Sequence, residues 1–529
     1  MKMFRSIFCL LIISAFVTVA GAQDKVVKSI IELGRTDNRS MKHLDILANQ
    51  FGGRILGSDA YENASVWCAD QFRKWGMEVQ MDEVGTLPVG FNRGPWFGRL
   101  LGENAMDLHF ATPSYTSGTK GVQRGHVVIE PRTQAEFDRM KGTLKGAWVL
   151  VTGMNTGWPI DYSAKGDSVR AKVLTENEEI GKKNREIMME NRQNAGKDEK
   201  PMLPYKEEPA LFYKQMREAG ILGIIQASTV PIRALYDRKN LEKMSFEKLP
   251  DVPDIKLDEH QYAVIEQMVK ERRYFQLEFD IRNHFRPGPI KYHNVIGIIR
   301  GTKYPDEYVM MGGHLDCFDV ATGGVDDGSG VTPAMEAARL IMASGGKPKR
   351  SILVCLWAGE EFGLWGSKSW VAENSKLLPK ISNYFNRDGG PTVPNSLTVP
   401  EAMYSDFEQI CEPLNTINSD FPFTLTKRAT PAGPMPRTAG GSDHAYFAMN
   451  GVPTLSFGLV DSKGYNFDYM EIWHTERDTY DKSIAEYQNQ TAVVTAVVVY
   501  GLSNLDHLLS RNGLYSDEPV NLTTTGGGN

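Results

Sequence analysis

From residue 293 onward, short apolar runs alternate with segments that have the apolar spacing of helices. The runs "EYVMMGGH" at 307–314 and "RSILVCLW" at 350–357 are typical of buried strands, and "TPAMEAARLIMAS" at 332–344 is typical of a helix. A strand, a helix and a second strand in this order favour a parallel sheet, because the helix carries the chain back to the starting edge. We therefore predict an α/β fold with a mainly parallel sheet covered by helices on both faces.

Polar side chains follow these apolar runs or lie in Gly-rich or polar loops near such runs. In open α/β sheets, ligands bind at the edge where the strands end. Two imidazoles and several carboxylates, without a thiolate, suit a borderline divalent cation such as Zn²⁺. One structural ion would need fewer carboxylates, so the surplus indicates two zinc ions that share a bridging carboxylate. The residues concerned are His314, Asp326, Glu360, Glu361, Asp388 and His474.

Each of these residues alone has an ordinary structural explanation. A single histidine is often only a hydrogen-bonded side chain, and aspartate before glycine is typical of a turn. Glu360 and Glu361 in "AGEEFG" could simply stabilise a helix N-terminus. Their joint occurrence at consecutive strand ends favours a site, in which one glutamate binds metal and its neighbour acts as a general base.

Several motifs in this region, taken in order, resemble those of one enzyme family. They are "GGHLDCFD", "GGVDDGSG", "LWAGEEFGLWGS", "NRDGG", "GGSDHAYF" and "WHTERDTYD". They resemble the motifs of the two-zinc exopeptidases of the aminopeptidase and carboxypeptidase Q type. The stretch "NVIGIIRGTKYPDEYVMMGGHLD" is especially similar to the carboxypeptidase Q branch. This resemblance covers nearly the whole chain after the first 22 residues.

The resemblance implies a role for each site residue. Glu360 would be the general base, which takes a proton from the attacking water and returns it to the leaving amine. Asp316 would orient the imidazole of His314, as many metal-bound histidines require. A cis peptide bond often follows the bridging aspartate in this family. The zinc ligands would be His314 and Asp388 for one ion, Glu361 and His474 for the other, and Asp326 between the two.

The motif "GGSDHAYF" would lie near the substrate, with Ser442, Asp443 and His444 as candidates for positioning it. His444 could instead be a third metal-binding histidine, although the family pattern already supplies five ligands. The expected substrates are short peptides. Aminopeptidase or dipeptidase action is favoured, because a zinc ion can accept a free α-amine beside the scissile carbonyl.

Three alternatives stay open at this point. Carboxypeptidase action relies on basic residues that bind the substrate carboxylate, and no such pair identifies itself in the sequence. A related fold performs glutaminyl cyclisation with a single zinc, and other relatives have lost their metals and serve as binding or receptor proteins. The complete ligand set argues against both of these.

The rest of the chain predicts how the domains are divided. Residues 23–116 and 287–516 would form the peptidase domain, and residues 117–286 a smaller β-rich insert. The insert resembles a protease-associated domain through "LKGAWVLVTG" and "MREAGILGIIQAS". Within it, residues 171–200 are rich in charges of both signs, which favours a solvated helix or loop over a lid across the active site.

The N-terminus has a basic start, an apolar run and then "AGA" before Gln23. This pattern predicts a signal peptide at 1–22 and export to a periplasm or the cell exterior, with no transmembrane anchor after cleavage. Residues 517–529 would be a flexible tail. The formal net charge of −6, with both signs interspersed, argues against nucleic acid as a partner, and a homodimer is left open. Scattered cysteines argue against a disulfide framework.

Overall fold

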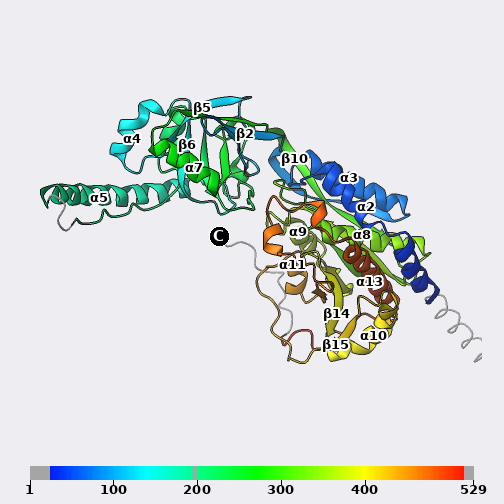
Figure 1. Cartoon of the computed structure of the whole chain (residues 1–529). Coiled ribbons are helices and arrows are strands. Elements are labelled where there is room, and N and C mark those ends of the chain that lie inside the picture. Colours follow the sequence, from blue (N-terminus) through cyan, green and yellow to red (C-terminus); the bar gives the residue numbers. More distant parts are fainter. Residues whose placement is uncertain (1–23, 195–198, 518–529) are drawn as a thin grey trace, which may run out of the picture.

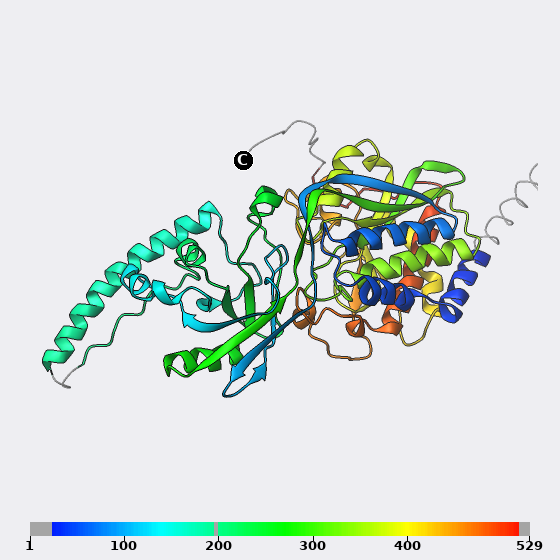
Figure 2. The same ribbon diagram turned by 90° about the horizontal axis from the view of Figure 1, so that it is seen from above.

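The computed structural model describes residues 24–194 and 199–517. It has two lobes, joined by a pair of long strands (Figures 1 and 2). We call residues 24–92 and 284–517 the main lobe, and residues 96–281 the insert lobe. The predicted signal peptide, and the predicted tail from residue 518 on, lie outside the described residues.

The main lobe is built on a five-stranded sheet with the order β1-β10-β12-β11-β13. Strands β12, β11 and β13 are parallel, whereas β10 runs antiparallel to both β1 and β12. The predicted parallel arrangement is thus found in β11, β12 and β13, and β10 adds an antiparallel strand that was not predicted. Because the insert lobe returns the chain beside β1, β10 can pair antiparallel with it without a crossover helix. The bounds are β1 Glu78–Asn92, β10 His284–Ile299, β11 Tyr304–His314, β12 Arg350–Trp357 and β13 Ile381–Asn386.

Helices cover both faces of this sheet, as the apolar strands require. All eight side chains of β12 are buried, and those of residues 352–357 alternate between two cores. Ile352, Val354 and Leu356 belong to the core under α3, α8 and α13. Leu353, Cys355 and Trp357 belong to the core under α9 and α11. These helices span Asp59–Lys74 (α3), Gly328–Ala343 (α8), Trp365–Glu373 (α9), His444–Met449 (α11) and Ala485–Ser503 (α13).

The remaining elements of the main lobe lie around this core. A three-stranded sheet has the order β15-β14-β16. Its strands span Val393–Val399 (β14), Thr424–Lys427 (β15) and Phe457–Val460 (β16), and the short helices are Ser40–Leu44 (α2), Glu401–Cys411 (α10) and Tyr469–Ile472 (α12). Cys68, Cys317, Cys355 and Cys411 are buried and free. Among the described residues, no helix is both long and apolar enough to cross a bilayer.

The insert lobe contains an eight-stranded sheet with the order β3-β2-β9-β5-β6-β7-β8-β4. Its strands are β2 Trp96–Gly102, β3 Met106–Asp107, β4 Phe110–Ala111, β5 Gln123–Ile129, β6 Ala147–Met154, β7 Gly223–Ser228, β8 Asp254–Asp258 and β9 Phe275–Ile281. The insert was predicted to start at residue 117, and this boundary is too late. Strand β2 pairs along its whole length with β9, from Trp96 opposite Ile281 to Gly102 opposite Phe275, so residues 96–111 belong to this lobe.

The charged segment of the insert forms most of the long helix α5, Ala164–Asn194. This helix points away from the main lobe in both views, as a solvated helix does and a lid would not (Figures 1 and 2). Asn177, Asn184 and Asn191 each exchange two hydrogen bonds with the backbone of one residue in the extended segment 200–206. The asparagines are spaced seven residues apart on the helix, and their partners three residues apart on the extended segment. Seven helical residues rise about as far as three extended ones, roughly 10 Å, so each asparagine lies opposite its partner. The other helices of this lobe are α4 Gln134–Met140, α6 Tyr213–Glu218 and α7 Glu259–Lys270.

Candidate metal centre

The predicted ligands meet at one edge of the main sheet. His314 is the last residue of β11, Glu360 and Glu361 follow β12, and Asp388 follows β13. These three strands are parallel neighbours, so their carboxyl ends lie side by side. Asp326 precedes α8, and His474 follows α12.

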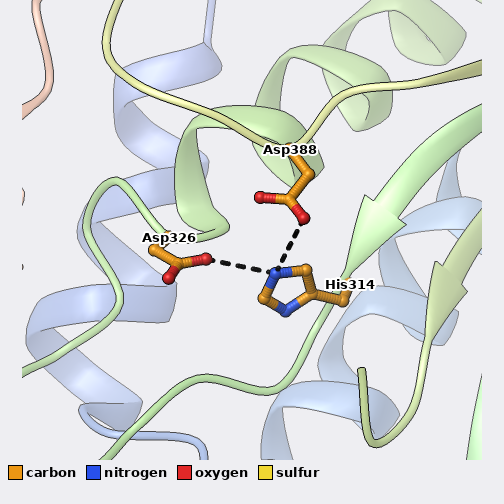
Figure 3. Close-up of side chains that lie close together, drawn as sticks. All are labelled: His314, Asp326 and Asp388. Carbon is orange, nitrogen blue, oxygen red and sulfur yellow. Dashed lines mark ion pairs between the residues drawn. The ribbon is translucent and has the colours of Figure 1, made fainter. Parts of the chain in front are cut away.

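The first ligand group contains His314, Asp326 and Asp388. The Nε2 atom of His314 lies 3.2 Å from Oδ1 of Asp326 and 3.8 Å from Oδ2 of Asp388. Figure 3 shows both carboxylates turned toward the imidazole. Two ligand atoms on one tetrahedral zinc ion lie about 3.3 Å apart, because zinc bonds to nitrogen and oxygen are about 2.0–2.2 Å long. The observed separations are of this size.

A second group contains Asp326, Glu361 and His474. The Nε2 atom of His474 lies 3.0 Å from Oε2 of Glu361 and 3.3 Å from Oδ2 of Asp326. Asp326 thus presents one oxygen to each imidazole. This arrangement suits a carboxylate that bridges two ions.

Two buried carboxylate oxygens of the cluster accept no hydrogen bond within the described part of the chain, which fits a bound cation. Oδ2 of Asp326 and Oε1 of Glu361 are buried and accept no hydrogen bond from the described residues. A buried carboxylate oxygen without a partner is costly, and a metal ion would satisfy it.

The pKa values of the clustered side chains indicate the same excess of negative charge. Burial raises the pKa of Glu361 to about 7, against the opposing charge of His474. Burial also raises the pKa of Glu360 to about 11, opposed by His314 and reinforced by the neighbouring carboxylates. Burial alone would lower the pKa of His474, but Glu361 and Asp326 raise it to about 10. Bound cations would compensate the carboxylates and displace these protons.

Hydrogen bonds of Arg387 hold the Asp388 loop against β11 and the start of α8. The neighbouring Arg387 donates its amide to the carbonyl of Gly312 at 3.0 Å and its Nε to the carbonyl of Ser329 at 3.1 Å. A Cβ atom on Gly330 would lie 2.1 Å from the carbonyl oxygen of Arg387. Only glycine therefore allows this approach, which brings Asp388 beside His314.

Two aspartates that the sequence analysis did not assign to roles hold the loop of the bridging residue. Oδ1 of Asp478 accepts from the amides of Val325 and Asp326, at 2.7 and 3.3 Å. Oδ2 of Asp327 accepts from the amide of His314 at 3.1 Å. The peptide bond between Asp326 and Asp327 is cis, as the family resemblance implied. Asp478 stands within the motif "WHTERDTYD", which was the only sequence signal for it.

We expect Asp478→Ala to lower zinc affinity by about 10–100-fold, because residues that orient metal ligands contribute this much. Asp478→Asn should lose less, since its amide oxygen can still accept the two hydrogen bonds. Competition titration with a chelator of known affinity measures the change. Asp481→Ala is the matched control, because Asp481 is exposed and its side chain bonds only Thr479 and Lys482 within the part of the chain that the structure describes. Equal zinc affinity in Asp478→Ala and the control would contradict this role.

Asp316 lies behind the two glutamates and is fully buried. Its carbonyl oxygen is 2.9 Å from Nδ1 of His314, while its carboxylate is 3.8 Å from the same atom. The carboxylate instead accepts from the amides of Glu360 and Glu361, at 3.1 and 3.3 Å. Asp316 therefore contacts the imidazole through its backbone and fixes the glutamates through its side chain.

The three predicted substrate-positioning residues lie in different surroundings. Ser442 and His444 line a cavity of about 300 Å³ that also includes Asp388. Asp443 is fully buried and accepts from Oγ of Ser367 at 2.5 Å, and it is not among the residues lining this cavity or the cleft described next. Neither group of residues that could hold a metal includes His444, among those the structure describes.

A cleft of about 430 Å³ opens beside the metal centre. Four acidic residues of the main lobe (Asp326, Glu360, Glu361 and Asp388) and His474 line it. The insert lobe adds Trp158, Tyr236 and Arg238 to the wall. Sequence reasoning missed these three, because nothing in their local pattern connects them with a site so far along the chain.

Comparison with known proteins gives a consistent result. Residues 294–499 match the family model described as peptidase family M28. Carboxypeptidase Q of Xenopus laevis is 24% identical over 503 residues, which cover 92% of this chain and 91% of that protein. Carboxypeptidase Q of Rattus norvegicus is 29% identical over 505 residues, covering 93% and 92%.

Solved structures share the fold. A peptidase M28 precursor from Shewanella amazonensis matches with a TM-score of 0.55 and 20% identity, over 92% of this chain and 98% of that one. A zinc aminopeptidase from Bacillus subtilis matches with a TM-score of 0.50 and 15% identity, over 90% and 97%. The predicted α/β class is thereby confirmed.

Proposed function

We propose that this chain, whose residues 294–499 form a peptidase family M28 domain, uses two zinc ions to hydrolyse the peptide bond next to a free terminus of short peptides. The observation that carries the proposal is the position of Asp326, which presents one oxygen to His314 and the other to His474. Each imidazole has a further carboxylate beside it: Asp388 lies beside His314, and Glu361 lies beside His474. Two ligand sets that share one carboxylate are what a two-metal hydrolase requires.

The residues of the chain have separate tasks in this proposal. Bound zinc ions would polarise the scissile carbonyl and make water a better nucleophile at neutral pH. His314, Asp388, Glu361, His474 and Asp326 would hold the ions. Glu360 lines the cleft with Oε2 only 4.0 Å from Nε2 of His314, which places its carboxylate at the centre of the cluster. There it would take a proton from the attacking water and deliver it to the leaving amine.

The proposal also states which end of the peptide must be free: the enzyme acts as an aminopeptidase or a dipeptidase, and so requires a free N-terminus. The acidic residues that line the cleft provide a negative environment for a free α-ammonium or α-amine group. The zinc aminopeptidase among the structural neighbours is in keeping with this polarity, whereas the name of the carboxypeptidase Q relatives points to the opposite one. The predicted signal peptide adds export from the cytoplasm to the proposal.

Blocking one terminus of a dipeptide tests the polarity. We expect N-acetylation to lower kcat/KM by at least about 10²-fold, because a polar site left without its partner discriminates strongly. Release of free amino acids from Leu-Gly, N-acetyl-Leu-Gly and Leu-Gly amide, measured by chromatography, gives the comparison. Fast cleavage of the acetylated peptide, with loss of activity on the amide, would establish carboxypeptidase polarity instead.

A further inference from the structure

Arg238 is the one lysine or arginine among the described residues that line the cleft. It comes from the insert lobe, whereas the four carboxylates of the cleft come from the main lobe. The two ends of a free peptide carry opposite charges. The distribution of charge across this cleft therefore matches that of a short peptide whose amine faces the metal centre and whose carboxylate faces Arg238.

The guanidinium of Arg238 is available for a ligand. It is exposed, and it has no hydrogen-bond or ion-pair partner in the part of the chain that the structure describes. The neighbouring Lys239, by contrast, forms an ion pair with Asp161 at 2.6 Å. The planar fork of a guanidinium fits a carboxylate with two parallel hydrogen bonds.

Aromatic contacts hold Arg238 in place relative to the metal centre. Its guanidinium lies over the ring of Trp158, with 5.3 Å to the ring centroid. Trp158 packs edge-on against Tyr236 at 5.6 Å, and Tyr236 stacks on Phe362 at 4.1 Å. Phe362 directly follows the metal-centre residue Glu361. The position of the cation is thus tied to the site through packed rings.

Backbone contacts fix the same segment at its other end. Ile232 donates its amide to Oε1 of Glu476 at 3.1 Å, and its carbonyl accepts from the amide of Glu476 at 3.0 Å. Glu476 lies two residues after His474. Residues 232–238 therefore contact the main lobe beside both Glu361 and His474, and in this way the insert lobe forms one wall of the cleft.

We propose that Arg238 binds the free α-carboxylate of the substrate peptide. The inference rests on the proposed peptidase function and adds a substrate-binding residue to it. Arg238 and the metal-centre residues line the same cleft, whose volume of about 430 Å³ is within the range of sites for small ligands. The insert lobe would then select peptides that end within the cleft, while the main lobe supplies the reactive groups.

The test compares Leu-Gly with Leu-Gly amide in wild type, Arg238→Ala and Arg238→Lys. For the free dipeptide we expect Arg238→Ala to lower kcat/KM by about 10- to 100-fold, mainly through KM, as for a lost charged hydrogen bond. Arg238→Lys should recover part of this, because it keeps the charge without the fork. Leu-Gly amide should be a poor substrate for wild type and hardly poorer for Arg238→Ala. Arg185→Ala, an exposed arginine on α5 of the same lobe, is the matched control.

The outcomes separate the two levels of the proposal. Equal losses on the free and amidated peptides in Arg238→Ala, or none on either, would overturn the role of Arg238 while leaving the peptidase function intact. Inactivity of the zinc-loaded wild type on every peptide would defeat the proposed function itself. A variant that cleaves Leu-Gly amide as slowly as wild type does is folded. A preference for Leu-Glu amide over Leu-Gln amide that depends on Arg238 would assign the residue to a side-chain carboxylate and overturn the α-carboxylate assignment.

Discussion

Glu360→Gln should lower kcat by about 10²–10⁴-fold, the typical contribution of general acid–base catalysis, while zinc content stays near that of wild type. Glutamine has nearly the volume of glutamate and can form hydrogen bonds, but its amide cannot accept the proton of the attacking water. KM should therefore change much less than kcat. Steady-state kinetics on a dipeptide, with zinc measured by atomic spectroscopy on the same sample, gives both quantities.

Glu361→Gln is the matched control for this substitution, since it changes the adjacent glutamate in the same way. Oε2 of Glu361 lies 3.0 Å from His474, so the loss of its charge should weaken zinc binding first and turnover as a consequence. Excess zinc should then restore part of the activity of Glu361→Gln and none of that of Glu360→Gln. Near-normal kcat in Glu360→Gln would refute its role as the base, and the reverse pattern would exchange the two roles.

Removal of metal should abolish activity, and about two zinc ions per chain should restore it. The physical reason is the set of buried carboxylates, which without cations must keep protons or repel one another. Zinc should also raise the midpoint of thermal unfolding, because a ligand that binds only the folded chain stabilises it by mass action. Dialysis against a strong chelator, followed by stepwise addition of zinc with activity and melting temperature recorded together, measures both effects.

The stoichiometry of this titration also tests the alternatives. Recovery complete at one zinc per chain would contradict the bridging role of Asp326 and favour a single-zinc enzyme of the glutaminyl cyclase kind. Full activity in the chelated protein would reject the mechanism altogether. Stable binding of two zinc ions without cleavage of any peptide would instead support a binding protein.

Local patterns in the sequence predicted the α/β class and the residues that meet at the sheet edge. His314, Glu360, Glu361 and Asp388 each stand at or just after the end of an apolar strand, and adjacent parallel strands end at one edge. A strand or a strand end is visible in a few consecutive residues, because burial sets its pattern. The proximity of these side chains was therefore within reach of sequence reasoning.

Sequence reasoning could not predict which strands pair when they lie far apart in the chain. The antiparallel direction of β10 and the true start of the insert depend on long-range pairing. Strand β1 pairs with residues 284–298, and β2 pairs with residues 275–281. Strand sequences do not encode the partner, since the same alternation of side chains suits either direction. Likewise, Asp478 acts through a loop that is distant in sequence, and an aspartate in a polar loop has no local mark of this role.

The sequence by itself thus determined which residue types gather at the sheet edge, because the residue types and their places at strand ends are local properties. Only the tertiary structure decided the shape of the cleft. Arg238, Tyr236 and Trp158 become part of its wall because the insert lobe packs its aromatic rings against Phe362 and its backbone against Glu476. Such contacts depend on the shape and apolar surface of two lobes after each has folded, and no window of consecutive residues contains that information.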